Sequence, residues 1–296
     1  GGASGFLGRV VDPEHAVGDG RGRRARYEGG NIYWKATTGA HEVHGTTLTE
    51  YGRQGGPTGR LGYPTSDTRT SGDKRSRYVN FEHGRIYYRG PAGTFAVPQP
   101  FFSKHESMKG VYGYLGYPKG HVRASADGGS TYQNYEKGRL YHRRGRVYEL
   151  HGRVFTYHER IKGVYGPLAY PVGDLQPVGD GRGKWQWFEG GMLWTSPQTS
   201  PFGLWGLILE RYFANGHCRG YLKYPVSSAR AVGDGRGRYA LFEHGRIYST
   251  PTTGGHQVHG AVLTYWLGRG GPTGALGYPT SELDPRGTPG GRFQQF

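Results

Sequence analysis

Apolar and polar residues alternate along this chain in short segments that end in glycine-containing turns. In residues 238–248, Arg-Tyr-Ala-Leu-Phe leads into Glu-His-Gly-Arg, and Ile-Tyr follows. The alternation predicts two antiparallel strands, and the glycine predicts a tight turn with a positive φ between them. Phe242 and Ile247 then share one face of this hairpin. The opposite face, which we expect to point outward, carries Tyr239, Glu243, Arg246 and Tyr248.

A short strand and a helix are predicted after the hairpin. Residues 256–260 indicate an edge strand, and residues 261–267 indicate a two-turn helix that ends before Gly270-Gly271, because glycine stops helices. Val262, Leu263 and Trp266 lie on one side of that helix. The following loop ends in Tyr278-Pro279, where the proline favours an extended entry into the next unit.

The same arrangement returns along the whole chain. A Leu-Gly-Tyr-Pro tetrapeptide or a variant of it begins at Leu61, Leu115, Leu168, Leu222 and Leu276, with spacings of 54, 53, 54 and 54 residues. A degenerate copy, Leu-Gly-Arg-Val, begins at Leu7. A fixed period of this size indicates a stack or ring of one supersecondary unit.

We therefore expect a mainly β fold: a five-bladed, propeller-like ring of repeats, each a β-hairpin with a short strand and a short helix. Closing the ring would remove exposed sheet edges, and an open array is the alternative. The expected units are residues 5–58, 59–112, 113–165, 166–219 and 220–273, with a sixth half-unit at 274–296. Because no single unit can bury its own apolar face, residues 1–296 are expected to form one repeat domain.

Composition narrows the class of protein. Only 34% of the residues are hydrophobic but 14% are aromatic, so tyrosine and tryptophan must supply much of the core. Cys218 is the single cysteine, which excludes an internal disulfide, and no apolar run is long enough for a membrane span. The net charge of +16 favours polyanionic partners such as anionic polysaccharides. Nucleic acid is disfavoured, because arginine and lysine are spread among turns and no nucleic-acid motif is present.

Several motifs are candidates for catalytic or metal sites. Gly-Asp-Gly-Arg-Gly recurs at 18–22, 179–183 and 233–237, but its spacing is not that of a dinucleotide or phosphate loop, so a turn is the simpler interpretation. His41 and His44, like His256 and His259, lie three apart and would face opposite sides of a strand. We expect these histidines to pack or to hydrogen-bond. Because the recurring acids are equivalent and no activated nucleophile is present, we expect no enzyme activity, no metal and no cofactor.

The Gly-x-Leu-Gly-Tyr-Pro loops, the Phe-Glu-x-Gly-x-Ile-Tyr hairpins and the period together resemble the LGFP repeat family over nearly the whole chain. Members of that family occur as tandem arrays in actinobacterial cell-envelope proteins, often appended to mycolyltransferases, amidases or other hydrolases. The resemblance implies a secreted or cell-wall location and attachment to wall glycan of the arabinogalactan or peptidoglycan type. It also implies a fused or associated envelope protein. The chain departs from the pattern at 7–10, at Pro98 and Pro100, and at Lys223.

The outward hairpin face supplies the candidate carbohydrate-binding residues. Sugars are recognised by aromatic platforms flanked by acids and arginines, and each unit has such a mixture. The candidates are Tyr33, Tyr87, Tyr141, Trp194 and Tyr248, with Glu28, Glu82, Glu136, Glu189, Glu243, Asp19, Asp73, Asp127, Asp180 and Asp234 as hydrogen-bond partners. Two alternatives stay open at these positions. Neighbouring units could cover this face, and the glutamates could tie the hairpin turn to the next unit's loop through backbone N–H groups. A protein-interaction adaptor within an extracellular assembly is the alternative function.

Overall fold

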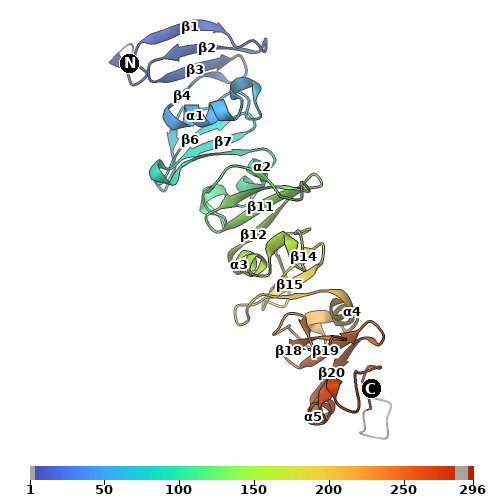
Figure 1. Ribbon diagram of the computed structural model, residues 1–296. Coiled ribbons are helices and arrows are strands. Elements are labelled where there is room, and N and C mark those ends of the chain that lie inside the picture. Colours follow the sequence, from blue (N-terminus) through green and yellow to red (C-terminus); the bar gives the residue numbers. More distant parts are fainter. Residues whose placement is uncertain (1–3, 284–292) are drawn as a thin grey trace. The chain divides into compact units, whose positions relative to one another are not determined.

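The computed structural model describes residues 4–283 and 293–296. Within these residues the chain forms five four-stranded antiparallel sheets, each built from four consecutive strands, with short helices between them (Figure 1). The mainly β, repeated fold is thus confirmed. The chain divides into two compact parts, residues 1–151 and 152–296. No described helix has the length and hydropathy needed to cross a membrane.

The first part contains three sheets and two helices. The first sheet comprises β1 (Val10–Ala16), β2 (Gly22–Tyr27), β3 (Gly30–Lys35) and β4 (Gly39–His44), and α1 (Gly45–Arg53) follows it. The second sheet comprises β5 (Arg69–Thr70), β6 (Arg77–Phe81), β7 (Gly84–Tyr88) and β8 (Thr94–Pro98), and α2 (Phe101–Ser107) follows. The third sheet comprises β9 (Arg123–Ala124), β10 (Thr131–Tyr135), β11 (Gly138–Arg143) and β12 (Arg146–His151).

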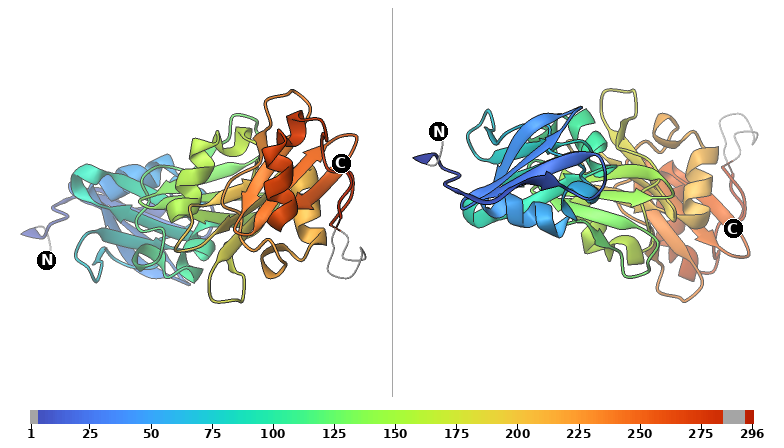
Figure 2. Two further views of the ribbon diagram at one scale, coloured as in Figure 1. Left: turned by 90° about the horizontal axis from the view of Figure 1, so that it is seen from below. Right: turned by 90° about the horizontal axis from the view of Figure 1, so that it is seen from above.

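The second part repeats this order. It begins with α3 (Gly152–Arg160), followed by the sheet of β13 (Gln176–Pro177), β14 (Lys184–Phe188), β15 (Gly191–Thr195) and β16 (Phe202–Leu204). After α4 (Gly206–Ala214) come β17 (Arg230–Ala231), β18 (Arg238–Phe242), β19 (Gly245–Thr250), β20 (Gly254–Val258) and α5 (Gly260–Gly268). Both parts are seen from two further sides in Figure 2.

The predicted hairpin is present in every sheet. In the fifth sheet, Tyr239 pairs with Tyr248, and the strands meet where Phe242 pairs with Gly245. A Cβ on Gly245 would lie 2.8 Å from the carbonyl oxygen of Val258, so the third strand needs a glycine at this turn. The edge strand at 254–258 and the helix at 260–268 also match the expectation closely.

A two-residue strand ahead of the hairpin in the second to fifth sheets was not predicted. In the second unit, Pro64 forms a single bridge to Phe81, and β5 pairs with β6 after it. Proline has no N–H to donate, so the ladder cannot run through it. The first unit has lost its Tyr-Pro. There Val10 pairs with Tyr27, and β1 extends over seven residues with a register shift near Pro13.

Helices α1 and α4 each lie in a core that two sheets share. Helix α1 contacts β3 and β4 of the first sheet and β7 and β8 of the second. Tyr33 and Val43 from one side, and Val79 and Ile86 from the other, form a buried cluster around Tyr51 of this helix. In the second part α4 packs in the same way against β15 before it and β18 to β20 after it.

Closure of the blades into a propeller ring is not shown. Each four-stranded sheet is open and begins and ends with an edge strand, as β1 and β4 do in the first sheet. The repeating unit has the expected length but contains a further element, because a one-turn 3₁₀ helix follows each described α-helix. These helices are Gly56–Thr58, Gly110–Tyr112, Gly163–Tyr165, His217–Arg219 and Gly271–Thr273.

The second residue of every tetrapeptide has a positive φ. These angles are +73° at Gly8, +69° at Gly62, +73° at Gly116, +57° at Ala169, +57° at Lys223 and +70° at Gly277. At Gly116 there is a second constraint, because a Cβ would lie 2.5 Å from Oε2 of Glu136. Glycine is favoured here by its freedom at positive φ and by the close approach of a carboxylate.

Gly116→Ala should therefore lower the free energy of unfolding by about 1–2 kcal/mol, the usual cost of a side chain in the left-handed region. Gly120→Ala is the matched control, since Gly120 has no neighbouring atom within 4 Å and no positive φ. Urea titration of both variants measures the difference. Equal midpoints for the two variants would contradict the assigned strain.

Candidate functional site

The registered aspartates lie in the turns before the hairpins, and Asp19, Asp73, Asp180 and Asp234 join consecutive repeats. Asp73 accepts hydrogen bonds from the backbone N–H of Arg75 at 3.1 Å and from the hydroxyl of Tyr117 at 2.7 Å. Tyr117 belongs to the tetrapeptide of the next repeat. The same hydroxyl-to-carboxylate bond joins Tyr63 to Asp19, Tyr224 to Asp180 and Tyr278 to Asp234. We call this contact the aspartate–tyrosine latch.

The latch depends on a protonated hydroxyl and an ionised carboxylate. Burial, together with the bond to Asp19, raises the pKa of Tyr63 to about 12, so the phenol keeps its proton and donates it. Burial opposes ionisation of Asp19, but the hydrogen bonds from Arg21 and Tyr63 outweigh it and lower the pKa of Asp19. Asp127 holds its own turn through Ser125 Oγ and the backbone N–H of Gly129.

The registered glutamates bind the tetrapeptide loop of their own repeat. Glu82 Oε2 accepts the backbone N–H of Tyr63 at 2.8 Å, and Lys35 of the preceding repeat forms an ion pair with the same carboxylate. Glu136 accepts the N–H of Tyr117 at 3.2 Å. The same kind of bond joins Arg9 N–H to Glu28 and Tyr224 N–H to Glu243, and Glu189 has the equivalent place after β14. The glutamates thus bind backbone N–H groups, as the structural alternative expected. The loop that they bind, however, belongs to their own unit and not to the next one.

A cation from the preceding repeat completes this contact. Arg75 and Arg89 each place a guanidinium nitrogen 2.8 Å from Glu136 Oε1, and Arg182 lies 2.6 Å from Glu243. Burial tends to raise the pKa of Glu136, but the N–H of Tyr117 and the two arginines lower it below its usual value. These carboxylates are therefore engaged in holding repeats together.

The five candidate aromatic rings are buried. Tyr33, Tyr87, Tyr141, Trp194 and Tyr248 are at most 4% exposed. Tyr87 packs edge-on against His105 and Tyr117, and Trp194 packs against Tyr212 of α4. The expectation of an outward-facing platform at these positions is wrong, because the rings are packed; Tyr33 and Tyr248, for example, lie edge-on against Tyr51 of α1 and Trp266 of α5. Buried in this way, the rings offer no face to a ligand in solvent.

A ring donor on each helix was missed. Its O–H or N–H donates to the backbone carbonyl of the second tetrapeptide residue, always 11 residues later. The pairs are Tyr51 with Gly62, His105 with Gly116, His158 with Ala169, Tyr212 with Lys223, and Trp266 with Gly277, at 2.6–3.0 Å. Burial lowers the pKa of His105 to about 4, so it donates as a neutral imidazole. The constant spacing of 11 residues could have revealed these donors, but three different residue types occupy the donor position.

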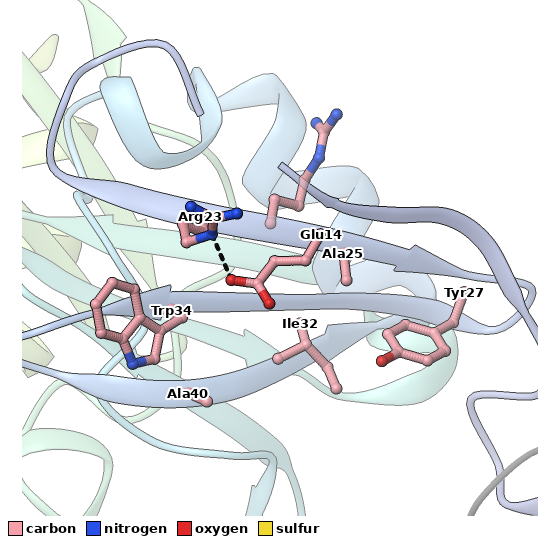
Figure 3. A pocket seen from close by; sticks show the side chains of 8 residues that line it. Glu14, Arg23, Ala25, Tyr27, Ile32, Trp34 and Ala40 are labelled. Atoms are coloured by element: carbon pink, nitrogen blue, oxygen red, sulfur yellow. Dashed lines mark ion pairs between the residues drawn. The ribbon is translucent and has the colours of Figure 1, made fainter. Parts of the chain in front are cut away.

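A hollow on the first sheet is the candidate binding site. It has a volume of about 340 Å³, and Figure 3 shows Trp34 at one end and Tyr27 at the other, with Ile32 between them. Its lining residues are Glu14, Arg23, Arg24, Ala25, Tyr27, Ile32, Trp34 and Ala40. Glu14 of β1 forms an ion pair with Arg23 of β2 at the rim.

The hollow exists because this sheet face has no helix on it in the described part of the chain. On the second sheet the equivalent face, with Val79, Phe81 and Ile86, is buried against α1. On the first sheet the face stays accessible, and Trp34 is 42% exposed. The long β1 strand brings Glu14 to the rim and supplies polar groups that the two-residue strands of later repeats do not reach. The result is a solvent-facing surface of aromatic and aliphatic side chains with charged neighbours.

The histidine pairs that were weighed as metal sites pack and hydrogen-bond instead, as expected. His41 contacts the carbonyl oxygen of Thr38 and the carboxylate of Asp67, and His256 contacts Thr253 and Glu282 in the same way. Among the described residues there is no group of three or more histidine, cysteine or acidic side chains that could hold a metal ion.

A family model described as LGFP repeat matches residues 7–59, 61–113, 168–220 and 222–274, which is more than half of the chain. The chain belongs to the LGFP repeat family. Each match begins at the leucine of a tetrapeptide or its variant. The intervening LGFP-like stretch from Leu115 carries the same motif, and its sheet of β9 to β12 has the same strand order.

Other comparisons add no functional information. No curated protein sequence matches the chain. A streptogramin B lyase structure aligns at 10% identity over 86% of this chain and 71% of that chain, with a TM-score of 0.15. The extracellular domain of a hybrid two-component system of B. thetaiotaomicron aligns at 13% identity over 86% of this chain and 28% of that chain, with a TM-score of 0.14. Scores this low carry no argument about fold or function.

Removing one hydroxyl should test the latch. Tyr117→Phe leaves the buried ring in place but removes the donor to Asp73, so the free energy of unfolding should fall by about 1.5–3 kcal/mol, the range for hydrogen bonds to charged groups. Tyr114→Phe is the control, since Tyr114 is 66% exposed. Urea unfolding of both variants measures the effect. A Tyr117→Phe variant as stable as the control would refute a stabilising latch.

The latch also predicts a particular response to acid. The hydrogen bond from the backbone N–H of Arg236, helped by the Tyr278 hydroxyl, lowers the pKa of Asp234 to about 2 against the opposing effect of burial. An aspartate in an unfolded chain has a pKa of about 3.9, so the stabilisation is present above about pH 4 and is lost as the pH falls towards 2. In urea titrations between pH 2 and 6, Asp234→Asn should show a shallower acid loss than the unaltered protein. Parallel curves would contradict this.

Proposed function

We propose that this LGFP repeat protein is a secreted, non-catalytic carbohydrate-binding protein that recognises bacterial cell-wall polysaccharide. The hollow on the first sheet is the observation that carries the proposal. An indole and a phenol flank an aliphatic floor, and charged groups of Glu14 and Arg23 stand at the rim. Pockets that combine an apolar lining with a few polar groups are typical ligand sites, and sugar rings offer C–H faces for the aromatics and hydroxyls for the rim.

Two further observations support this proposal. The registered carboxylates already accept hydrogen bonds within and between repeats, so they do not form the free acid–base pair that glycoside cleavage uses. The net charge of +16 attracts wall polymers that carry phosphate or uronate groups. Both favour attachment over catalysis.

Trp34→Ala should weaken retention on purified wall polysaccharide. Truncating an aromatic anchor of a binding site costs about 2 kcal/mol or more, so the affinity should fall by a factor of about 30 or more. Tyr265→Ala is the control, because Tyr265 is 59% exposed and does not line the hollow. The measurement is retention on arabinogalactan-type and peptidoglycan-type fractions, with monosaccharides as competitors. If the Trp34→Ala variant folds normally and binds as tightly as the control, the hollow is not the binding site.

A protein-interaction adaptor is the second candidate, and one observation favours it. The face that forms the hollow is the face on which later sheets receive a helix carrying an aromatic ring, as Phe81 receives Tyr51 at 4.6 Å. A helix from another envelope protein could be held in the same way. Two results together would favour the adaptor. The protein would bind a partner protein stably and stoichiometrically, with Trp34→Ala abolishing that binding, and it would not be retained on any wall fraction.

A further inference from the structure

Three exposed aromatic rings stand at one repeat position, each beside a histidine. The ring belongs to the residue before the tetrapeptide leucine, and the histidine ends the fourth strand of the same sheet or directly follows it. Ring centroids are 5.1 Å apart for Phe6 and His44, 5.0 Å for Tyr114 and His151, and 4.1 Å for Tyr221 and His259. We call these the aromatic–histidine pairs. The aromatic members are 69%, 66% and 54% exposed, in the same order.

The fold does not require these pairs. The second repeat has Arg60 and Pro98 at the two positions, and the fourth has Pro167 and Trp205. Both of those repeats nevertheless form the same four-stranded sheet. Single exposed aromatics are ordinary on protein surfaces, but exposed rings in register at the first, third and fifth repeats are not explained by packing.

The histidines give the rings a fixed position. The Tyr114 and His151 rings are nearly parallel, with an interplanar angle of 7°, so the imidazole supports one face of the phenol. His44 Nδ1 lies 2.5 Å from Glu42 Oε2, and His151 Nε2 lies 3.3 Å from Glu149 Oε2. These carboxylates orient the imidazoles. The high exposure of each aromatic leaves ring surface accessible for stacking against a ligand.

We propose that the three aromatic–histidine pairs are equivalent stacking sites for sugar rings of the same polysaccharide. This inference rests on the proposed function and adds a mode of binding: several weak sites in addition to the hollow, repeated at alternate LGFP repeats. A polymer that occupies more than one site on a chain gains affinity without any new contact, because the second binding event is intramolecular.

The test uses Phe6→Ala, Tyr114→Ala and Tyr221→Ala, singly and combined. With a short wall-derived oligosaccharide in calorimetry, each substitution should reduce the number of bound ligands by one and leave the remaining affinity unchanged. With the intact polysaccharide, the triple variant should bind at least about 100-fold more weakly, as expected when multivalency is lost. Tyr165→Ala is the matched control, because Tyr165 is 65% exposed and belongs to none of the pairs.

The outcomes separate this inference from the proposed function. Urea midpoints should stay unchanged in all variants, because the substituted rings are exposed. If the unaltered protein binds and the triple variant keeps both its ligand number and its polymer affinity, the stacking sites are refuted and the hollow still stands. If the unaltered protein binds no wall fraction, the proposed function itself is overturned, and the stacking sites with it.

Discussion

The tetrapeptide loop is the contact on which the repeat stack depends. Around one turn of backbone, the carbonyl of Gly62 receives the Tyr51 hydroxyl, the N–H of Tyr63 binds Glu82, and the Tyr63 hydroxyl reaches Asp19 of the preceding repeat. The loop therefore joins a helix, a hairpin and the neighbouring turn. A chain with 34% hydrophobic residues has a limited apolar area to bury. Charged hydrogen bonds of about 1.5–3 kcal/mol each supply part of the stability that a larger apolar core would give.

The sequence predicted the repeat, the hairpin and the helix, because each has residues of the same chemical type at a regular spacing. It did not predict the two-residue strands, which consist of a few ladder bonds beside a proline and have no pattern of their own. The ring donors were missed for another reason. Tyr51, His105 and Trp266 are different residue types, yet each donates a ring N–H or O–H to the carbonyl at the same position of the tetrapeptide.

The candidate site was misplaced for a reason that applies to any array. Tyr87 and its equivalent Tyr248 stand at a position that is aromatic in every repeat. The position is aromatic because it is buried in the packing of the repeat. Period-two alternation assigns residues to the two faces of a sheet but does not reveal that both faces are covered. The exposed rings of the proposed binding sites instead lie at positions that are filled differently from one repeat to the next. Trp34 lies on the unit that has lost its Tyr-Pro, and Tyr114 at a position that alternate repeats fill differently.

Helix α5 and the first sheet differ in whether described residues cover them. Phe296 stacks on Trp266 at 5.3 Å, and the Gln294 amide donates to the carbonyls of Gln257 and Ser281, as Gln133 does to Ala96 and Gly120 in the third sheet. These final residues thus cover α5 as a further repeat would. No α-helix lies ahead of β1 in the described residues, and the first sheet keeps its apolar face accessible. Within each part, the described carboxylates and ring donors are used in contacts between elements of the chain, and the hollow is a surface of the first sheet that no described helix covers.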